Sequence, residues 1–172
     1  MALALGTTGC ATQRPGPYAP ISESDRQTST AERLNQEAAD LMQDDPEKAE
    51  KLLREALTAD LYHGPSHNNL GILYLKQGKL YEAANEFEWA RKLMPGHPDP
   101  RMNLAFTLES AGRVDEAIQM YATALEVYPD HIQTLQALTR LQMRTKKTDG
   151  RTERFLSEIA LRGETEEWRV WA

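Results

Sequence analysis

Apolar and small residues return along this chain at helical spacing, and the helical pattern itself repeats about every 34 residues. Between about residues 30 and 163, apolar positions fall three and four residues apart, which places their side chains on one face of an α-helix. Three series share the longer period: Ala49, Ala83 and Ala117; Ala56, Ala90 and Ala124; and Leu53, Phe87 and Tyr121. A fixed period of this length predicts a stack of helix-turn-helix units rather than a closed globule.

Residues that end helices keep the same period. Gly78 and Gly112 lie midway in two units, where the first helix must stop in a left-handed conformation that glycine adopts readily. Pro95 and Pro129 close the same units, because proline cannot continue a helix interior. These marks divide the chain into units at about 30–63, 64–97, 98–131 and a degenerate 132–163.

The second and third units resemble the tetratricopeptide repeat family at eight positions each, in one register. The matching residues are Leu70, Gly71, Tyr74, Gly78, Ala83, Phe87, Ala90 and Pro95, then Leu104, Ala105, Leu108, Gly112, Ala117, Tyr121, Ala124 and Pro129. The resemblance implies an all-α fold, a right-handed α-solenoid of about three and a half tetratricopeptide repeats. The first and fourth units match less well, as expected of terminal repeats that meet solvent on one face. The fourth keeps Leu135, Leu138, Leu141 and Phe155.

The resemblance also implies where a partner binds. In this family the first helix of each unit lines a concave groove, which holds a protein or peptide segment, either an amphipathic helix or an extended chain. The groove residues carried over by position are Asn68, Ile72, Leu75, Lys76, Met102, Phe106, Glu109, Gln136, Arg140, Met143 and Arg144. The alternative for any one of them is packing between neighbouring first helices.

Some family members hold a partner's terminal carboxylate in this groove with lysine and asparagine side chains. Asn69 and Asn103 match such asparagines. Asp99 and Gln133, however, stand where a lysine would be needed. The resemblance therefore does not extend to this carboxylate clamp, and it disfavours an adaptor for chaperone tails.

The segment before the repeats differs from them in composition. Residues 1–10 read MALALGTTGC, and residues 11–29 are rich in Pro, Gly, Ser and Thr, which is typical of a disordered tether. A small residue before Cys10, an apolar leader and a tether resemble the start of a bacterial lipoprotein. The leader lacks the basic start of a full signal and is shorter than one.

The lipoprotein resemblance implies that Cys10 is lipidated and is the only membrane attachment. It places the protein in the bacterial cell envelope, facing the periplasm, where it would help to assemble a complex such as a pilus or secretion system. The alternative is a cytoplasmic tetratricopeptide adaptor or structural subunit with no lipid and an incidental cysteine.

Charge and candidate chemistry narrow the function further. A net charge of -6 argues against a nucleic-acid partner, which selects a basic face. His63, His97 and His131 share the period, but equivalent positions in a stack lie about 8–10 Å apart. Zinc ligands must lie about 2.0–2.1 Å from one ion. We therefore expect these histidines to bond local backbone, with no metal and no cofactor.

No catalytic pattern appears in the sequence. No Ser-His-Asp arrangement can be placed, and neither a glycine-rich phosphate loop nor an H-E-x-x-H helix occurs. We therefore expect no enzyme activity.

Residues 164–172 form a tail in which Trp168 and Trp171 share one helix face. These tryptophans either cover the last repeat or bind a partner, a second copy of the chain included.

Overall fold

The computed structural model describes residues 26–162 and 165–171, and the regular secondary structure in these residues is α-helical. The helices are α1 (Thr28–Leu41), α2 (Pro46–Ala59), α3 (Gly64–Lys76), α4 (Leu80–Leu93), α5 (Asp99–Ser110), α6 (Val114–Val127), α7 (Ile132–Thr145), α8 (Thr152–Arg162) and α9 (Glu166–Trp171). Cys10 and the first part of the tether lie outside the described residues.

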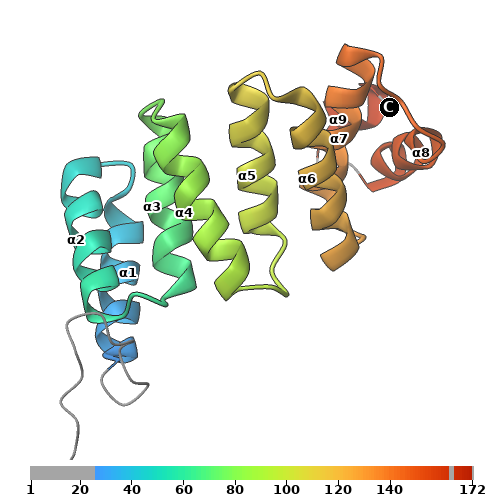
Figure 1. Cartoon of the computed structure of the whole chain (residues 1–172). Coiled ribbons are helices and arrows are strands. Elements are labelled where there is room, and N and C mark those ends of the chain that lie inside the picture. Colours follow the sequence, from blue (N-terminus) through green and yellow to red (C-terminus); the bar gives the residue numbers. More distant parts are fainter. Residues whose placement is uncertain (1–25, 163–164, 172) are drawn as a thin grey trace, which may run out of the picture.

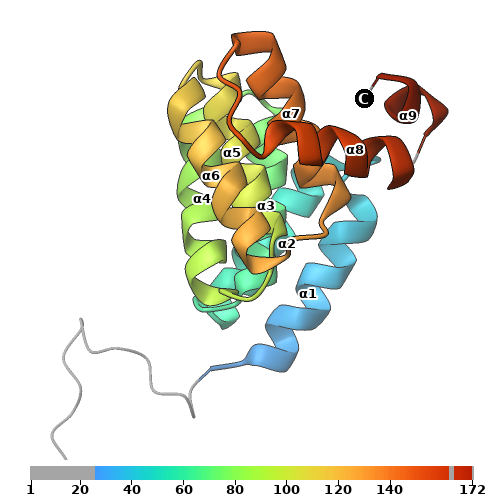
Figure 2. The same ribbon diagram turned by 90° about the vertical axis from the view of Figure 1, so that its right-hand side faces the viewer.

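Successive helices form hairpins that stand side by side in chain order, from α1 and α2 at one end to α7 and α8 at the other (Figure 1). Viewed from the end of the stack, α4 and α6 lie on one side and α1 and α7 toward the other (Figure 2). The first helices α1, α3 and α5 also contact one another along the stack. This arrangement confirms the α-solenoid that the sequence period predicts.

The second helices keep the period to the residue. Helices α2, α4 and α6 begin at residues 46, 80 and 114 and end at residues 59, 93 and 127. The three periodic series of the sequence lie on the buried sides of these helices, each residue with no exposed surface: Ala49, Ala83, Ala117, Ala56, Ala90, Ala124, Leu53, Phe87 and Tyr121. The alanines let the helices of a hairpin approach, and the bulky series fills the space that remains.

Helices α3 and α4 approach each other closely at Gly71. A Cβ atom placed on Gly71 would lie 2.7 Å from a ring carbon of Phe87, well inside the van der Waals distance. Phe87 is fully buried against this glycine. The pair explains why the second unit combines a glycine with a fully buried phenylalanine.

The turn inside each of the last three hairpins contains one residue in the left-handed conformation. Gly78 and Gly112 have φ angles of 74° and 76°, and Lys146, one period later, has a φ of 56°. The backbone therefore keeps its turn geometry in the fourth unit although the glycine is lost. A lysine in this conformation carries steric strain that glycine does not.

Replacing Lys146 by glycine should stabilise the fold by about 0.5–1 kcal/mol, because relief of strain outweighs the added freedom of the unfolded chain. Chemical unfolding of the two proteins measures the difference. The matched change Gly112→Ala should have the opposite sign, since it creates the same strain at the equivalent turn. A lower unfolding midpoint for Lys146→Gly would refute this account of the turn.

The fourth hairpin departs from the period after this turn. Helix α8 begins at Thr152, four residues beyond the position that the period gives from Val114. In Figure 2, α8 runs nearly at right angles to α6. The expected register is therefore wrong in α8: Ile159 is its fully buried residue, and Phe155 packs only at the edge of the core. Leu135, Leu138 and Leu141 of α7 are buried as predicted.

The tail residues form the short helix α9. Trp168 is partly buried and packs against the hydrophobic core, as expected of a side chain that covers the last repeat. Trp171 remains 44% exposed, and its ring meets that of Trp168 edge to face with centroids 5.5 Å apart. None of the helices in the described ranges is long and apolar enough to cross a membrane.

Candidate protein-binding groove

The first helices are tied together by asparagine side chains. The Asn69 amide donates to the Asn35 side-chain oxygen at 2.9 Å, linking α3 to α1. The Asn103 amide donates to the Asn68 side-chain oxygen at 3.1 Å, linking α5 to α3. These bonds hold successive first helices side by side, so that their outer surfaces form one continuous face. We call the surface made by α1, α3, α5 and α7 the first-helix face.

The apolar residues expected in the groove lie at two depths on this face. Phe106 of α5 and Met143 of α7 are exposed, at 43% and 47%. Ile72, Leu75 and Met102 are partly buried and pack against the core. Two large side chains on neighbouring helices are therefore open to a partner, and three others form a floor that also belongs to the fold.

Glu109 and Arg144, both expected at the rim, bind each other. Arg144 Nη2 donates to Glu109 Oε1 at 2.7 Å, and the Tyr121 hydroxyl donates to Oε2 at 3.2 Å. The Glu109 side chain is only 8% exposed. Burial, with the nearby Glu109 carboxylate, raises the pKa of Tyr121 well above its usual range. The Glu109 carboxylate thus joins α5, α6 and α7, and little of it remains for a partner.

The remaining expected groove residues differ in access. Asn68 is half-buried and Lys76 is exposed. Gln136 is buried, so a partner could reach its amide only after the side chain moves. Arg140 is half-buried and makes no hydrogen bond or ion pair with the described residues. The groove assignment as a whole stays a prediction, and the structure indicates which members are open.

A shallow hollow between α3 and α5 contains the position where a clamp would need lysine. It is lined in part by Asn68, Asn69, His97 and Asp99. The Asp99 carboxylate lies 3.7 Å from His97 Nδ1 and 3.5 Å from His131 Nε2. The hollow therefore presents a carboxylate between two imidazoles, and a partner's carboxylate would meet like charge there. No group of three metal-binding side chains occurs among the described residues.

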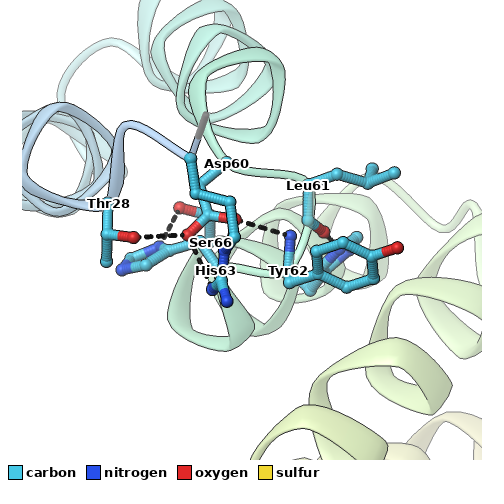
Figure 3. A network of polar contacts seen from close by, with 8 residues as sticks. Thr28, Asp60, Leu61, Tyr62, His63 and Ser66 are labelled. Carbon is cyan, nitrogen blue, oxygen red and sulfur yellow. Dashed lines mark hydrogen bonds and ion pairs between the residues drawn. The ribbon is translucent and has the colours of Figure 1, made fainter. Parts of the chain in front are cut away.

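An ion pair with the buried Asp60 side chain connects the segment before α1 to the residue that follows α2 (Figure 3). Arg26 donates through Nε and Nη2 to the two oxygens of Asp60, at 2.8 and 2.9 Å. The Thr28 hydroxyl and the Tyr62 backbone N–H donate to the same carboxylate, at 2.9 and 3.0 Å. The hydrogen bonds from Arg26 are the main cause of a lowered pKa for the Asp60 carboxyl, whose side chain is fully buried.

Asp60→Asn should lower the free energy of unfolding by about 2 kcal/mol at neutral pH, because Arg26 loses its charged acceptor. The Asp60 pKa is lower in the folded than in the unfolded protein. Its contribution is therefore present above the unfolded value of about 3.9 and disappears as pH falls through the folded value. Urea unfolding across this range should show the two proteins converging in acid. A constant difference would count against the ion pair, and Asp115→Asn, whose side chain is 82% exposed, is the control.

The histidines do not bond local backbone as expected. His63 Nδ1 lies 2.7 Å from Ser66 Oγ, and His63 Nε2 lies 2.9 Å from Glu32 of α1. His131 repeats the first contact, with Thr134 at 2.7 Å. Only His97 follows the expectation, accepting from the Asp99 backbone N–H at 3.4 Å. Ser66 and Thr134 lie two periods apart, but the sequence pattern did not reveal these contacts because Pro100 interrupts the hydroxyl series between them.

His63 also forms part of a Ser-His-acid arrangement that the sequence did not reveal. Ser66, His63 and Glu32 are joined in series by the two bonds just described. The Ser66 side chain, however, has no exposed surface, and its hydroxyl also contacts Asn35. A buried hydroxyl offers no approach for a substrate, so the arrangement connects two units of the solenoid.

Comparison with known proteins agrees with this architecture. Residues 74–141, about two fifths of the chain, match a family model described as tetratricopeptide repeat. Stacked repeats of this kind create extended binding surfaces. The matched stretch runs from the second half of α3 into α7, and over this stretch the chain is similar to the tetratricopeptide repeat family.

Individual relatives are distant. The chain is 24% identical over 98 residues to mouse tetratricopeptide repeat protein 8, a match that spans 57% of this chain and 19% of that protein. Among solved structures, Pseudomonas aeruginosa pilF has a TM-score of 0.73 at 17% identity, covering 81% of this chain and 64% of that one. The first tetratricopeptide domain of Spaghetti (RPAP3), bound to the HSP90 peptide SRMEEVD, has a TM-score of 0.66 at 15% identity, covering 71% and 98%. At these identities the structures establish the fold alone.

Proposed function

We propose that this chain is a scaffold that binds an apolar segment of a partner protein along the first-helix face. The observation that carries the proposal is the exposure of Phe106 and Met143 on two neighbouring first helices. Large apolar side chains on adjacent helices suit an amphipathic helix or an extended segment laid across them. The RPAP3 domain, a neighbour in fold, holds a peptide. The hollow beside Asp99 presents a carboxylate, so we expect this chain to bind a chemically different segment from the peptide of that domain.

Site-specific photo-crosslinking tests this proposal. A photoreactive residue at position 76 would lie on the first-helix face, and the same residue at position 51 would lie on the exposed side of α2. In the native organism we expect position 76 to trap a defined partner and position 51 to trap none. Trapping from position 51 alone would place the binding surface on the other side of the solenoid and overturn the proposal.

We further propose that a lipid on Cys10 holds this scaffold at a membrane of the bacterial cell envelope, facing the periplasm. The support is the lipoprotein-like leader and tether that precede the repeats. Multiple acyl chains bind a membrane firmly, whereas one alone gives only marginal binding. Membrane fractionation and mass analysis of the protein from its native host should find an acylated Cys10. An unmodified Cys10 in a soluble product would favour the cytoplasmic adaptor instead.

The proposed role at the envelope is to help assemble a multiprotein complex, such as a pilus or secretion system. A repeat array behind a lipidated cysteine would present its groove to envelope components within reach of the tether from the membrane. Sequencing the genomic DNA upstream of Met1 separates the two locations. An in-frame extension with basic and apolar residues favours the envelope, and a stop codon beside a ribosome site favours the cytoplasm.

A further inference from the structure

Arg140 differs from the other arginines of the solenoid in its lack of a partner. Every other arginine between residues 26 and 162 makes a hydrogen bond or an ion pair, for example Arg144 with Glu109 and Arg54 with Glu50. The Arg140 guanidinium makes neither among the described residues, although the residue is half-buried on α7. A guanidinium presents five N–H donors in a fixed plane that matches a carboxylate.

A second donor without a partner lies one helical turn away. Gln136 is four residues before Arg140, so the two side chains leave the same face of α7. Gln136 is only 6% exposed, and its Nε2 has no acceptor in the described part of the chain. Buried amide donors are nearly always hydrogen-bonded in folded proteins, so one left open points to an acceptor supplied from elsewhere.

The charges around these donors leave a positive excess. Both Arg140 and Arg144 act on the Tyr121 hydroxyl, which itself donates to Glu109. The single carboxylate of Glu109 is already bound by Arg144 and Tyr121. One further carboxylate would therefore complete a second ion pair at this joint between α5 and α7.

We propose that Arg140 and Gln136 form a subsite for an acidic side chain of the bound partner segment. This inference rests on the proposed function, and it adds the partner's chemistry: an apolar segment with Asp or Glu beside its apolar residues. Met143 lies three residues from Arg140 on the same helix. A partner's apolar residue on Met143 and its acidic residue on Arg140 would therefore lie within about one helical turn of each other. The carboxylate meets Arg140 first, and the buried Gln136 amide turns to donate to it.

The subsite is separate from the clamp positions discussed above. Those positions are held by Asp99 and Gln133, and Asp99 carries the opposite charge. The acidic hollow at Asp99 and the basic subsite at Arg140 are one repeat apart along the first-helix face. A bound segment thus has a preferred direction, with its acidic residue toward α7.

Selection from a random-peptide phage library tests the subsite without a known partner. The full chain, its Arg140→Gln variant and the control Arg154→Gln are each immobilised; Arg154 is 78% exposed on α8. We expect the wild type and the control to select peptides with Asp or Glu at a constant spacing from apolar residues. Arg140→Gln should select apolar peptides with no acidic enrichment.

A selected peptide then gives the magnitude. Changing its acidic residue to the amide should weaken binding to the wild type about tenfold, the size expected for one charge-assisted hydrogen bond. The same change should have little effect on Arg140→Gln, because the interaction is already lost. Arg140→Lys keeps the charge without the planar fork and should show a reduced preference for acid. If Arg140→Gln loses its helical circular dichroism signal, the wild type is compared with Arg140→Lys instead.

The outcomes separate this inference from the proposed function. Selection of the same apolar peptides by wild type and Arg140→Gln, with no acidic residue in common, overturns the subsite and leaves the scaffold proposal standing. Failure of the folded wild-type chain to enrich any peptide overturns both. Acidic enrichment that survives in Arg140→Gln also overturns the subsite, because some other cation would then supply the charge.

Discussion

Replacing Phe106 and Met143 together by alanine is expected to weaken partner binding by about 100-fold. Truncation of an apolar anchor costs roughly 1.4 kcal/mol, which is about a factor of ten in affinity, and two such truncations multiply to about 100-fold. The two side chains are 43% and 47% exposed in the free protein, so their contacts with the partner would be lost with little change in the fold. Calorimetric titration with the crosslinked partner, or with a selected peptide, gives the affinity.

The control is Tyr81→Ala, a large side chain that is 78% exposed on α4. It should bind the partner as the wild type does, and all three proteins should unfold within about 0.5 kcal/mol of one another. Met102 is a less suitable target than the sequence suggests, because it packs against the core and its loss would affect fold and binding together. Unchanged affinity in the double variant would remove the first-helix face from consideration.

Phe87→Ala is expected to produce the largest loss of stability, about 4 kcal/mol. The side chain is fully buried and packs so closely on Gly71 that no other side chain can fill the cavity from that side. A loss of this size is a large fraction of the about 5–15 kcal/mol by which folded domains are stable. Guanidinium unfolding, followed by circular dichroism, measures it.

Phe87→Leu keeps most of the volume and should lose much less, while Tyr81→Ala on the same helix should lose almost nothing. Because repeats contact only their neighbours, the damage should begin in the second unit and spread along the stack. Hydrogen exchange would show this as early loss of protection in α3 and α4. A loss of stability below about 1 kcal/mol for Phe87→Ala would mean that the surrounding side chains move in and fill the cavity.

The repeat itself was predictable from the sequence because local chemistry dictates it. A small residue is required where two helices touch, as at Ala83 and Ala117, and a large one where a gap remains, as at Phe87 and Tyr121. Gly78 and Gly112 mark turns whose left-handed backbone favours glycine. These requirements recur once in every unit, and so the limits of α2, α4 and α6 follow the period.

The fourth unit and the site were less predictable. The four-residue delay of α8 arises in a turn where Lys146 adopts the left-handed conformation of a glycine, so the sequence carried no mark of it. Likewise, the family positions did not distinguish Phe106, which is open, from Glu109, which is nearly buried. Only the packing of α5 against α6 and α7 brings Tyr121 and Arg144 to the Glu109 carboxylate.

By itself, then, the sequence determined the solenoid and its register through the third unit, because both depend on contacts within one repeat or between neighbours. Tertiary structure alone decided which side chains on that face are already engaged. Ion pairs between units join partners from different repeats, such as Arg162 with Asp130 and Arg144 with Glu109. Such pairs depend on how whole helices are oriented, and a periodic sequence does not specify this orientation. The same holds for Arg140, because only the positions of all its described neighbours show that it makes no hydrogen bond or ion pair with them.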